Sequence, residues 1–111
     1  MISRRACAWT LLLWGAHAHA QTVGVAPELW DRPRSARAVL GETAVKQAVN
    51  GYLAQPDARL VIHHGTAQES MMQAEELRSW LVALAVEPQR IGLLGDLKSG
   101  ETLRIEIAST R

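Results

Sequence analysis

Two long segments of the chain repeat their apolar residues at helical spacing. From Thr43 to Ala54 the apolar positions fall at i, i+3, i+4, i+7 and i+8, which predicts one buried stripe of an amphipathic helix. A second helical segment begins near Thr66, where Thr66 and Glu69 have the spacing of a capping box, and extends for about 19 residues to near Ala85. Its predicted buried positions are Met71, Ala74, Leu77, Leu81 and Leu84. Its predicted solvent-facing positions are Glu75, Glu76, Arg78 and Ser79.

Shorter apolar runs predict the strands. Arg59–His63 holds three consecutive large aliphatic residues between turn residues, as expected of a central strand covered on both faces. Arg90–Leu94 predicts another strand, and Thr102–Ala108 alternates apolar and polar residues, which indicates a strand with one exposed face. The first strand is predicted at Leu29–Asp31 or at Ala38–Leu40, although the latter also fits a turn of helix. The predicted fold class is α+β: a two-layer sandwich of βαβαββ order, with two helices packed on one mixed sheet.

The first twenty residues have the three parts of a secretory signal peptide. The basic pair Arg4 and Arg5 precedes the apolar stretch Ala6–Ala16, and small residues follow at Ala18 and Ala20. This apolar stretch of about a dozen residues is shorter than the roughly 20 that a membrane-spanning helix needs. The sequence therefore predicts cleavage after Ala20, a periplasmic location and no transmembrane segment in the mature chain.

The rest of the 111-residue chain is long enough for one small domain. Residues 21–28 are predicted to be a flexible lead and residues 29–111 the domain, so a two-domain enzyme is excluded. With no Phe and 5% aromatic residues, the core must consist of Leu, Val, Ile and Ala. Basic and acidic residues nearly balance, which argues against nucleic-acid binding. Cys7 lies in the predicted signal, so the mature chain has neither a disulfide nor a cysteine-based site.

Several residue strings occur in the order of a known family. Val61–Thr66 stands where that family has an apolar residue followed by Gly-His-Thr-Asp, and Ser70 with Gln73 stands where it has Leu-Ser, two residues and Arg-Ala. Leu103–Ile107 is similar to its closing Arg-Arg-Val-Glu-Ile. Over Leu29–Ala108 the chain thus resembles the OmpA-like C-terminal domain, a family that attaches outer membranes to peptidoglycan. The resemblance implies a minimal, degenerate member of this family.

The resemblance also implies a ligand pocket that has lost its charges. In the family, an Asp after the second strand and an Arg on the second helix hold the diaminopimelate of the peptide stem. Thr66 and Gln73 stand at those places here, so most of the affinity for a zwitterionic ligand is expected to be lost. The degenerate pocket implied by the resemblance consists of His64, Thr66, Gln73 and Arg104.

No metal, cofactor or catalytic site is expected. His63 and His64 are adjacent at a strand end, where their side chains point to opposite faces, so they are not expected to share a metal ion. Ser70, His64 and Glu69 are the residue types of a hydrolytic triad, but the sequence lacks the Gly-x-Ser-x-Gly turn. A small periplasmic hydrolase is therefore the least favoured alternative.

A partner contact is predicted at Trp30, Arg32, Arg34 and Met72, because Trp and Arg are frequent at interface hot spots and Met adapts to irregular contacts. The alternative is that residues 30–34 are a linker. The leading hypothesis is an exported non-enzymatic envelope protein that binds or scaffolds a protein partner. The alternative hypothesis is peptidoglycan binding through the modified pocket.

We expect export to remove the first twenty residues. Mass spectrometry of the protein from envelope extracts should give a chain that begins at Gln21, because small residues at Ala18 and Ala20 follow the apolar stretch. Recovery only of a cytosolic chain that begins at Met1 would contradict export.

Overall fold

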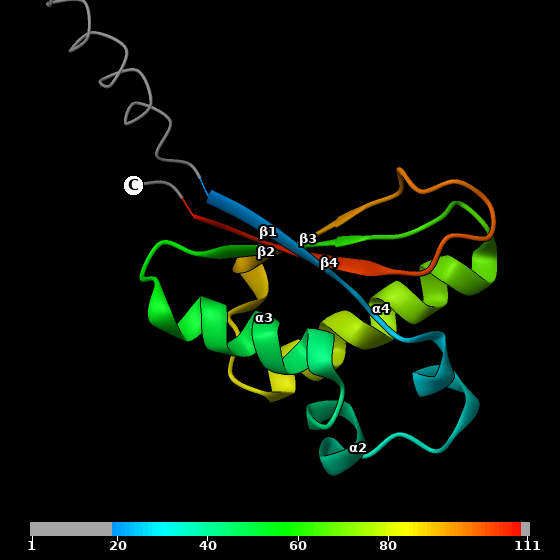
Figure 1. Cartoon of the computed structure of the whole chain (residues 1–111), viewed down its shortest axis with the longest axis horizontal. Helices are drawn as coiled ribbons and strands as arrows, with labels where there is room; N and C mark the ends of the chain where they lie inside the picture. The colour runs from blue at the N-terminus through cyan, green and yellow to red at the C-terminus, as the bar shows by residue number, and fades with distance from the viewer. Residues whose placement is uncertain (1–18, 110–111) are drawn as a thin grey trace, which may run out of the picture.

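The computed structural model describes residues 19–109, which form an α+β fold with three α-helices on a four-stranded mixed sheet (Figure 1). Most of the predicted signal peptide therefore lies outside the described residues. In chain order the elements are β1 (His19–Gly24), the 3-10 helix η1 (Pro27–Asp31), α2 (Ala36–Leu40), α3 (Thr43–Ala54), β2 (Arg59–His63), α4 (Gln68–Ala83), the 3-10 helix η2 (Pro88–Arg90), β3 (Ile91–Leu94) and β4 (Arg104–Ser109).

The strand order in the sheet is β1-β4-β2-β3. β4 runs antiparallel to both β1 and β2, whereas β2 and β3 are parallel. A parallel pair needs a crossover connection, and α4 supplies it between β2 and β3. Figure 1 shows α3 and α4 on the same side of the sheet, where α3 packs on β1, β2 and β4 and α4 packs on β2.

The N-terminal part of the fold differs from the prediction. Residues 21–24, expected within a flexible lead, belong to β1, which pairs with β4 from His19↔Ser109 to Gly24↔Arg104. The N–H of Val25 continues this pairing with a 2.8 Å hydrogen bond to the carbonyl of Leu103, and Val25 is buried. This edge strand was missed because its hydrogen-bond partners lie in β4, near the other end of the chain.

The first strand was also predicted at the wrong residues. Leu29–Asp31 lies in η1, where Pro27 occupies the first turn, and Ala38–Leu40 lies in α2, as the helical alternative predicted. Ser35 caps α2, because its Oγ accepts the N–H of Ala38 at 3.1 Å. The predicted βαβαββ order is therefore wrong: the order is β-η-α-α-β-α-β-β, with η2 before β3.

α3 has the predicted bounds and approaches the sheet closely. Val45 and Ala48 are fully buried, as predicted, whereas Leu53 at the end of the stripe is 68% exposed. Gly51 faces β4, because a Cβ on Gly51 would lie 3.0 Å from Cγ2 of Ile107. A glycine inside this helix thus costs helix propensity but allows closer packing on the sheet.

α4 is shorter than predicted at both ends. It begins after Ala67 without a side-chain cap, so the predicted Thr66 capping box is wrong. The preceding turn is instead held by Ser70, whose Oγ accepts the N–H of Gly65 at 2.7 Å. The helix ends at Ala83 because Ala85 adopts a φ of 84° and the N–H of Val86 returns to the carbonyl of Leu81.

The buried face of α4 is predicted correctly at its centre only. Ala74, Leu77 and Leu81 are fully buried, but Met71 is 47% exposed, so its predicted core position is wrong. Glu76 was predicted to face water and is instead half-buried against Arg34. The cause is the segment before α2, which covers this side of the helix and has no helical or strand periodicity.

One face of the sheet carries the core and the other carries polar groups. β2 has the predicted bounds, but only Leu60 and Ile62 are fully buried. Val61 and His63 point to the opposite face and are partly exposed. The prediction that both faces of this strand are covered is therefore wrong. β4 alternates as predicted, with Ile105 and Ile107 among its buried residues. The core includes Leu29, Val39, Ala44, Val45, Ala48, Leu60, Ile62, Leu77, Leu81, Ile105 and Ile107.

Replacing Leu77 should destabilise this core. Leu77→Ala should lower the free energy of unfolding by about 2 to 5 kcal/mol, because a fully buried large side chain is lost and leaves a cavity. Glu75→Ala, two residues earlier and exposed on the other side of the helix, is the matched control and should change it by less than about 0.5 kcal/mol. Chemical denaturation of both variants measures the difference, and a larger loss for Glu75→Ala than for Leu77→Ala would mean that α4 is turned the other way.

Candidate functional site

A groove of about 1000 Å³ lies beside the first half of α4. One wall is the 27–34 segment, with Trp30 and Arg34, and the floor includes Met72 and Gln73 of α4. The turn before β4, including Glu101, forms the other wall. We refer to this depression as the α4 groove. It joins three segments that are far apart in the sequence.

Arg34 holds the 27–34 segment against α4. Its Nε and Nη2 donate to Oε2 and Oε1 of Glu76 at 2.8 and 3.0 Å, a bidentate pair. Its Nη1 donates to the backbone carbonyls of Trp30 at 3.1 Å and Arg32 at 2.9 Å. Four of the five guanidinium N–H groups are therefore used within the protein.

Both tryptophans of the described segment belong to this cluster. The guanidinium carbon of Arg34 lies 5.3 Å from the ring centroid of Trp30, within the range of a cation–π contact. The indole N–H of Trp80 donates to Oε2 of Glu76 at 3.1 Å. The hydrogen bond from Arg34, and then that from Trp80, lower the pKa of Glu76 despite partial burial. Glu76 is thus ionised and fixed in position at neutral pH.

Three of the four predicted partner-contact residues share the α4 groove. Trp30, Arg34 and Met72 all line it, and Met72 is 63% exposed. The side chain of Arg32 is also exposed, but Arg32 is not part of the lining and contributes its carbonyl to Arg34. The segment 30–34 is therefore bound to α4 rather than extended as a free linker.

The residues of the predicted degenerate pocket do not converge. Gln73 lines the α4 groove, whereas Arg104 lines a second, smaller depression beside His63. Thr66 is exposed in the turn before α4. His64 follows β2 and packs against Gly95, where a Cβ would lie 3.1 Å from the imidazole. The four side chains thus occupy different places around the end of β2.

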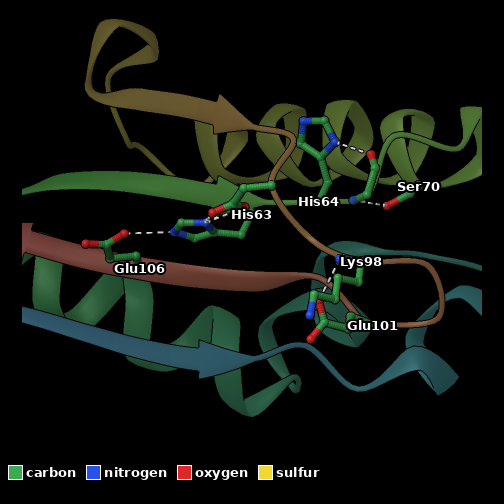
Figure 2. Close-up of polar contacts among 8 residues, drawn as sticks. His63, His64, Ser70, Lys98, Glu101 and Glu106 are labelled. Carbon is green, nitrogen blue, oxygen red and sulfur yellow. Dashed lines mark hydrogen bonds and ion pairs between the residues drawn. The ribbon is translucent and has the colours of Figure 1, made fainter.

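His64 and Ser70 are both bound to the backbone of Gly65. Nδ1 of His64 lies 2.7 Å from the carbonyl oxygen of Gly65, so this nitrogen carries the donated proton, while Ser70 accepts the N–H of Gly65. Figure 2 shows this arrangement at the start of α4. Within residues 19–109, no hydrogen bond joins His64 to Ser70, which are the base and nucleophile of the hydrolase alternative.

The second polar cluster lies on the sheet face opposite α3 and α4. His63 of β2 has Nδ1 at 2.9 and 3.1 Å from the carboxylate oxygens of Asp96, and Nε2 at 2.8 Å from Oε1 of Glu106 on β4 (Figure 2). Thr22 and Arg104 complete the lining of a depression of about 490 Å³. Figure 2 also shows the ring of His64 pointing away from that of His63, as predicted for adjacent residues.

Two carboxylates require His63 to be an imidazolium. A neutral imidazole has one N–H and one lone pair, so it can donate to only one of them. Burial lowers the pKa of His63, but hydrogen bonds from its ring to Glu106 and Asp96, together with their negative charges, outweigh this and raise it. The hydrogen bond with His63 in turn lowers the pKa of Asp96.

The sequence carried little sign of either cluster. Arg34 and Glu76 are 42 residues apart, and His63 is separated by 33 residues from Asp96 and by 43 from Glu106. The one available signal was the pairing of two predicted strands, which places alternate residues of β2 and β4 on one face. That pairing groups His63 with Glu106 and Arg104 but gives no sign of Asp96, which lies in a loop.

Two kinds of feature are absent from the part of the chain that the structure describes. Among residues 19–109, no group of three His, Asp or Glu side chains is arranged to hold a metal ion. Within the same residues, no helix has the length and apolar composition needed to cross a membrane. No family model matches the chain, and neither does a curated protein or a solved structure.

Protonation of His63 should make the stability of the protein depend on pH. Because the pKa of His63 is higher in the folded state than its usual value of about 6.5, its stabilisation is fully present below that value. The stabilisation is lost as the pH rises through the folded-state pKa. The melting temperature of wild type should therefore exceed that of His63→Gln by more at pH 5.5 than at pH 8.5.

Differential scanning calorimetry of the two proteins at both pH values measures this change. Glu106→Gln removes one of the two carboxylates and should reduce the same pH dependence while leaving His63 in place. A difference in melting temperature that stays constant or grows toward alkaline pH would contradict the assigned protonation.

Proposed function

We propose that this protein is an exported, non-enzymatic binding protein of the cell envelope that contacts a protein partner through the α4 groove. Its fold would be a minimal, degenerate OmpA-like domain, in which helices and sheet form two layers. The observation that carries the proposal is the groove itself, where exposed Met72 lies beside a prebuilt cluster of Trp30, Arg34 and Glu76.

The rigidity of the groove wall supports binding rather than a linker role. Binding costs less free energy when contact residues are already ordered. Arg34 is ordered by contacts with the backbone and with Glu76, and the aromatic ring of Trp30 is stacked beneath its guanidinium. Trp and Arg are, together with Tyr, the residue types enriched at interface hot spots.

The proposed OmpA-like relationship is supported by the secondary structure of the residue strings on which the resemblance rests. Val61 and Ile62 lie in β2, Gln73 lies in the following helix, and Ile105 lies in the last strand. Export is supported by the residue pattern of the first twenty residues. Cleavage after Ala20 would leave residues 21–24 of β1, and so most of its pairing with β4.

Peptidoglycan binding is the second candidate, and one observation favours it. Gln73, which stands where the family has its ligand-binding Arg, lines the α4 groove together with Arg34. The guanidinium needed for a ligand carboxylate is thus present on another segment of the groove. Arg34 is, however, engaged by both carboxylate oxygens of Glu76, which disfavours a second anion.

Site-directed photocrosslinking in living cells tests the leading proposal. The full chain is expressed with a photoreactive amino acid at position 72, in the groove, or at position 53, where Leu53 is equally exposed on α3. We expect a discrete protein adduct in the envelope from position 72 and none from position 53. Position 53 controls for collisions with abundant neighbours.

The crosslinking experiment can overturn the proposal, and two further assays test the alternatives. Equal adducts from both positions, or none from position 72, would show that the groove is not a partner contact. Cosedimentation of the purified protein with cell-wall sacculi would support the peptidoglycan alternative, and turnover of model esters would support the hydrolase.

A further inference from the structure

The lining of the α4 groove has an excess of negative charge. Four carboxylates line it, from Asp31, Glu69, Glu76 and Glu101, against the single guanidinium of Arg34. Glu76 and Arg34 form a bidentate pair and neutralise each other. The other three carboxylates are exposed and come from the three different segments that form the groove.

We propose that the groove accepts a polypeptide segment of the partner that carries Lys or Arg side chains. This inference rests on the proposed function, since it specifies the chemistry of the partner for the same groove. The basis is charge complementarity: cationic side chains would meet carboxylates on every wall.

The hydrogen bonds already made by the charged groups of the groove indicate which sign of charge a ligand should carry. Arg34 has four of its N–H groups occupied, so the cation of the groove is not free to receive a ligand carboxylate. By contrast, within residues 19–109, neither an ion pair nor a hydrogen bond engages the carboxylates of Asp31 and Glu69. Glu101 accepts the backbone N–H of Lys98 through one oxygen, which leaves the second available and fixes the carboxylate in place (Figure 2).

The apolar surface of the groove suits long cationic side chains. Lys and Arg place their methylene stems on apolar surface while the charged end reaches a carboxylate or water. Met72, 63% exposed, offers a flexible thioether for such stems, and Glu69 lies less than one helical turn away on the same helix. A short acidic or uncharged segment would leave the three carboxylates unpaired.

Hexalysine is a defined probe for this site. Tryptophan indole N–H signals in NMR spectra report on the groove, because Trp30 lines it and Trp80 is bonded to its Glu76. With the protein purified from the envelope, we expect hexalysine to shift the Trp30 signal and hexaglutamate to leave it unchanged. The affinity for hexalysine should fall as salt is raised, because exposed ion pairs are screened.

Charge-removing variants locate the binding. Glu69→Gln and Glu101→Gln should each weaken hexalysine binding by about two- to five-fold, the change expected for one exposed ion pair. Glu75→Gln is the matched control, since Glu75 is exposed on the same helix but lies outside the groove lining. It should leave the affinity unchanged, although it removes the same charge from the protein.

Three results would overturn the inference. The first is a shift of the Trp30 signal with hexaglutamate or a diaminopimelate-containing stem peptide but not with hexalysine. The second is an equal loss of hexalysine affinity in Glu75→Gln and Glu69→Gln. The third is no shift of the Trp30 signal with any probe. If the photocrosslink from position 72 is still found, only the basic character of the partner is wrong. If that adduct is also missing, the proposed function itself has failed.

Discussion

The pairing of β4 on both of its edges is the constraint on which the rest of the fold depends. β4 is the last strand in the chain, yet it joins the first strand to β2, and through β2 to β3. Its inward residues, including Ile105 and Ile107, pack beneath α3, where Gly51 allows close approach. A chain with a small aliphatic core and no disulfide in its described part thus obtains much of its order from long-range backbone pairing. The two ends of the described segment are held together by the same strand.

The sheet separates two polar clusters, which differ in whether their ionic interactions depend on pH. On the face away from the helices, His63 bridges two carboxylates and needs its proton to do so, which makes this cluster sensitive to pH. Beside α4, hydrogen bonding between Arg34 and Glu76 raises the pKa of Arg34 and lowers that of Glu76, so both are charged at neutral pH. Their pair is held by backbone carbonyls and an indole. The first cluster joins β2 to β4 and to the loop that follows β3. The second joins the 27–34 segment to α4.

The sequence predicts the elements whose signal is local. α3 and β2 were predicted with the correct bounds, because helical spacing over twelve residues and a short apolar run are visible without any partner. β1 was missed because its hydrogen bonds come from β4, 80 to 90 residues later. The half-buried position of Glu76 depends on a segment without periodicity, which brings Arg34 against one side of α4. Separations of 33 to 43 residues between partners hid both polar clusters in the same way. Trp30, Arg34 and Met72 had been selected from their chemistry as candidate contact residues, which stays a prediction.

The charges that line the groove favour a cationic ligand over an anionic one. The proposed OmpA-like alignment is consistent with this, because Thr66 and Gln73 would stand at its charged positions and neither residue carries a charge. The one cation of the groove comes instead from Arg34, outside α4, and its charge is already matched by Glu76. A carboxylate entering the groove would have to displace Glu76 from a bidentate pair, and an unpaired charge would then remain at the indole of Trp80. A cation faces no such cost, because Asp31, Glu69 and Glu101 are already exposed. The free charges that line the α4 groove are therefore all negative.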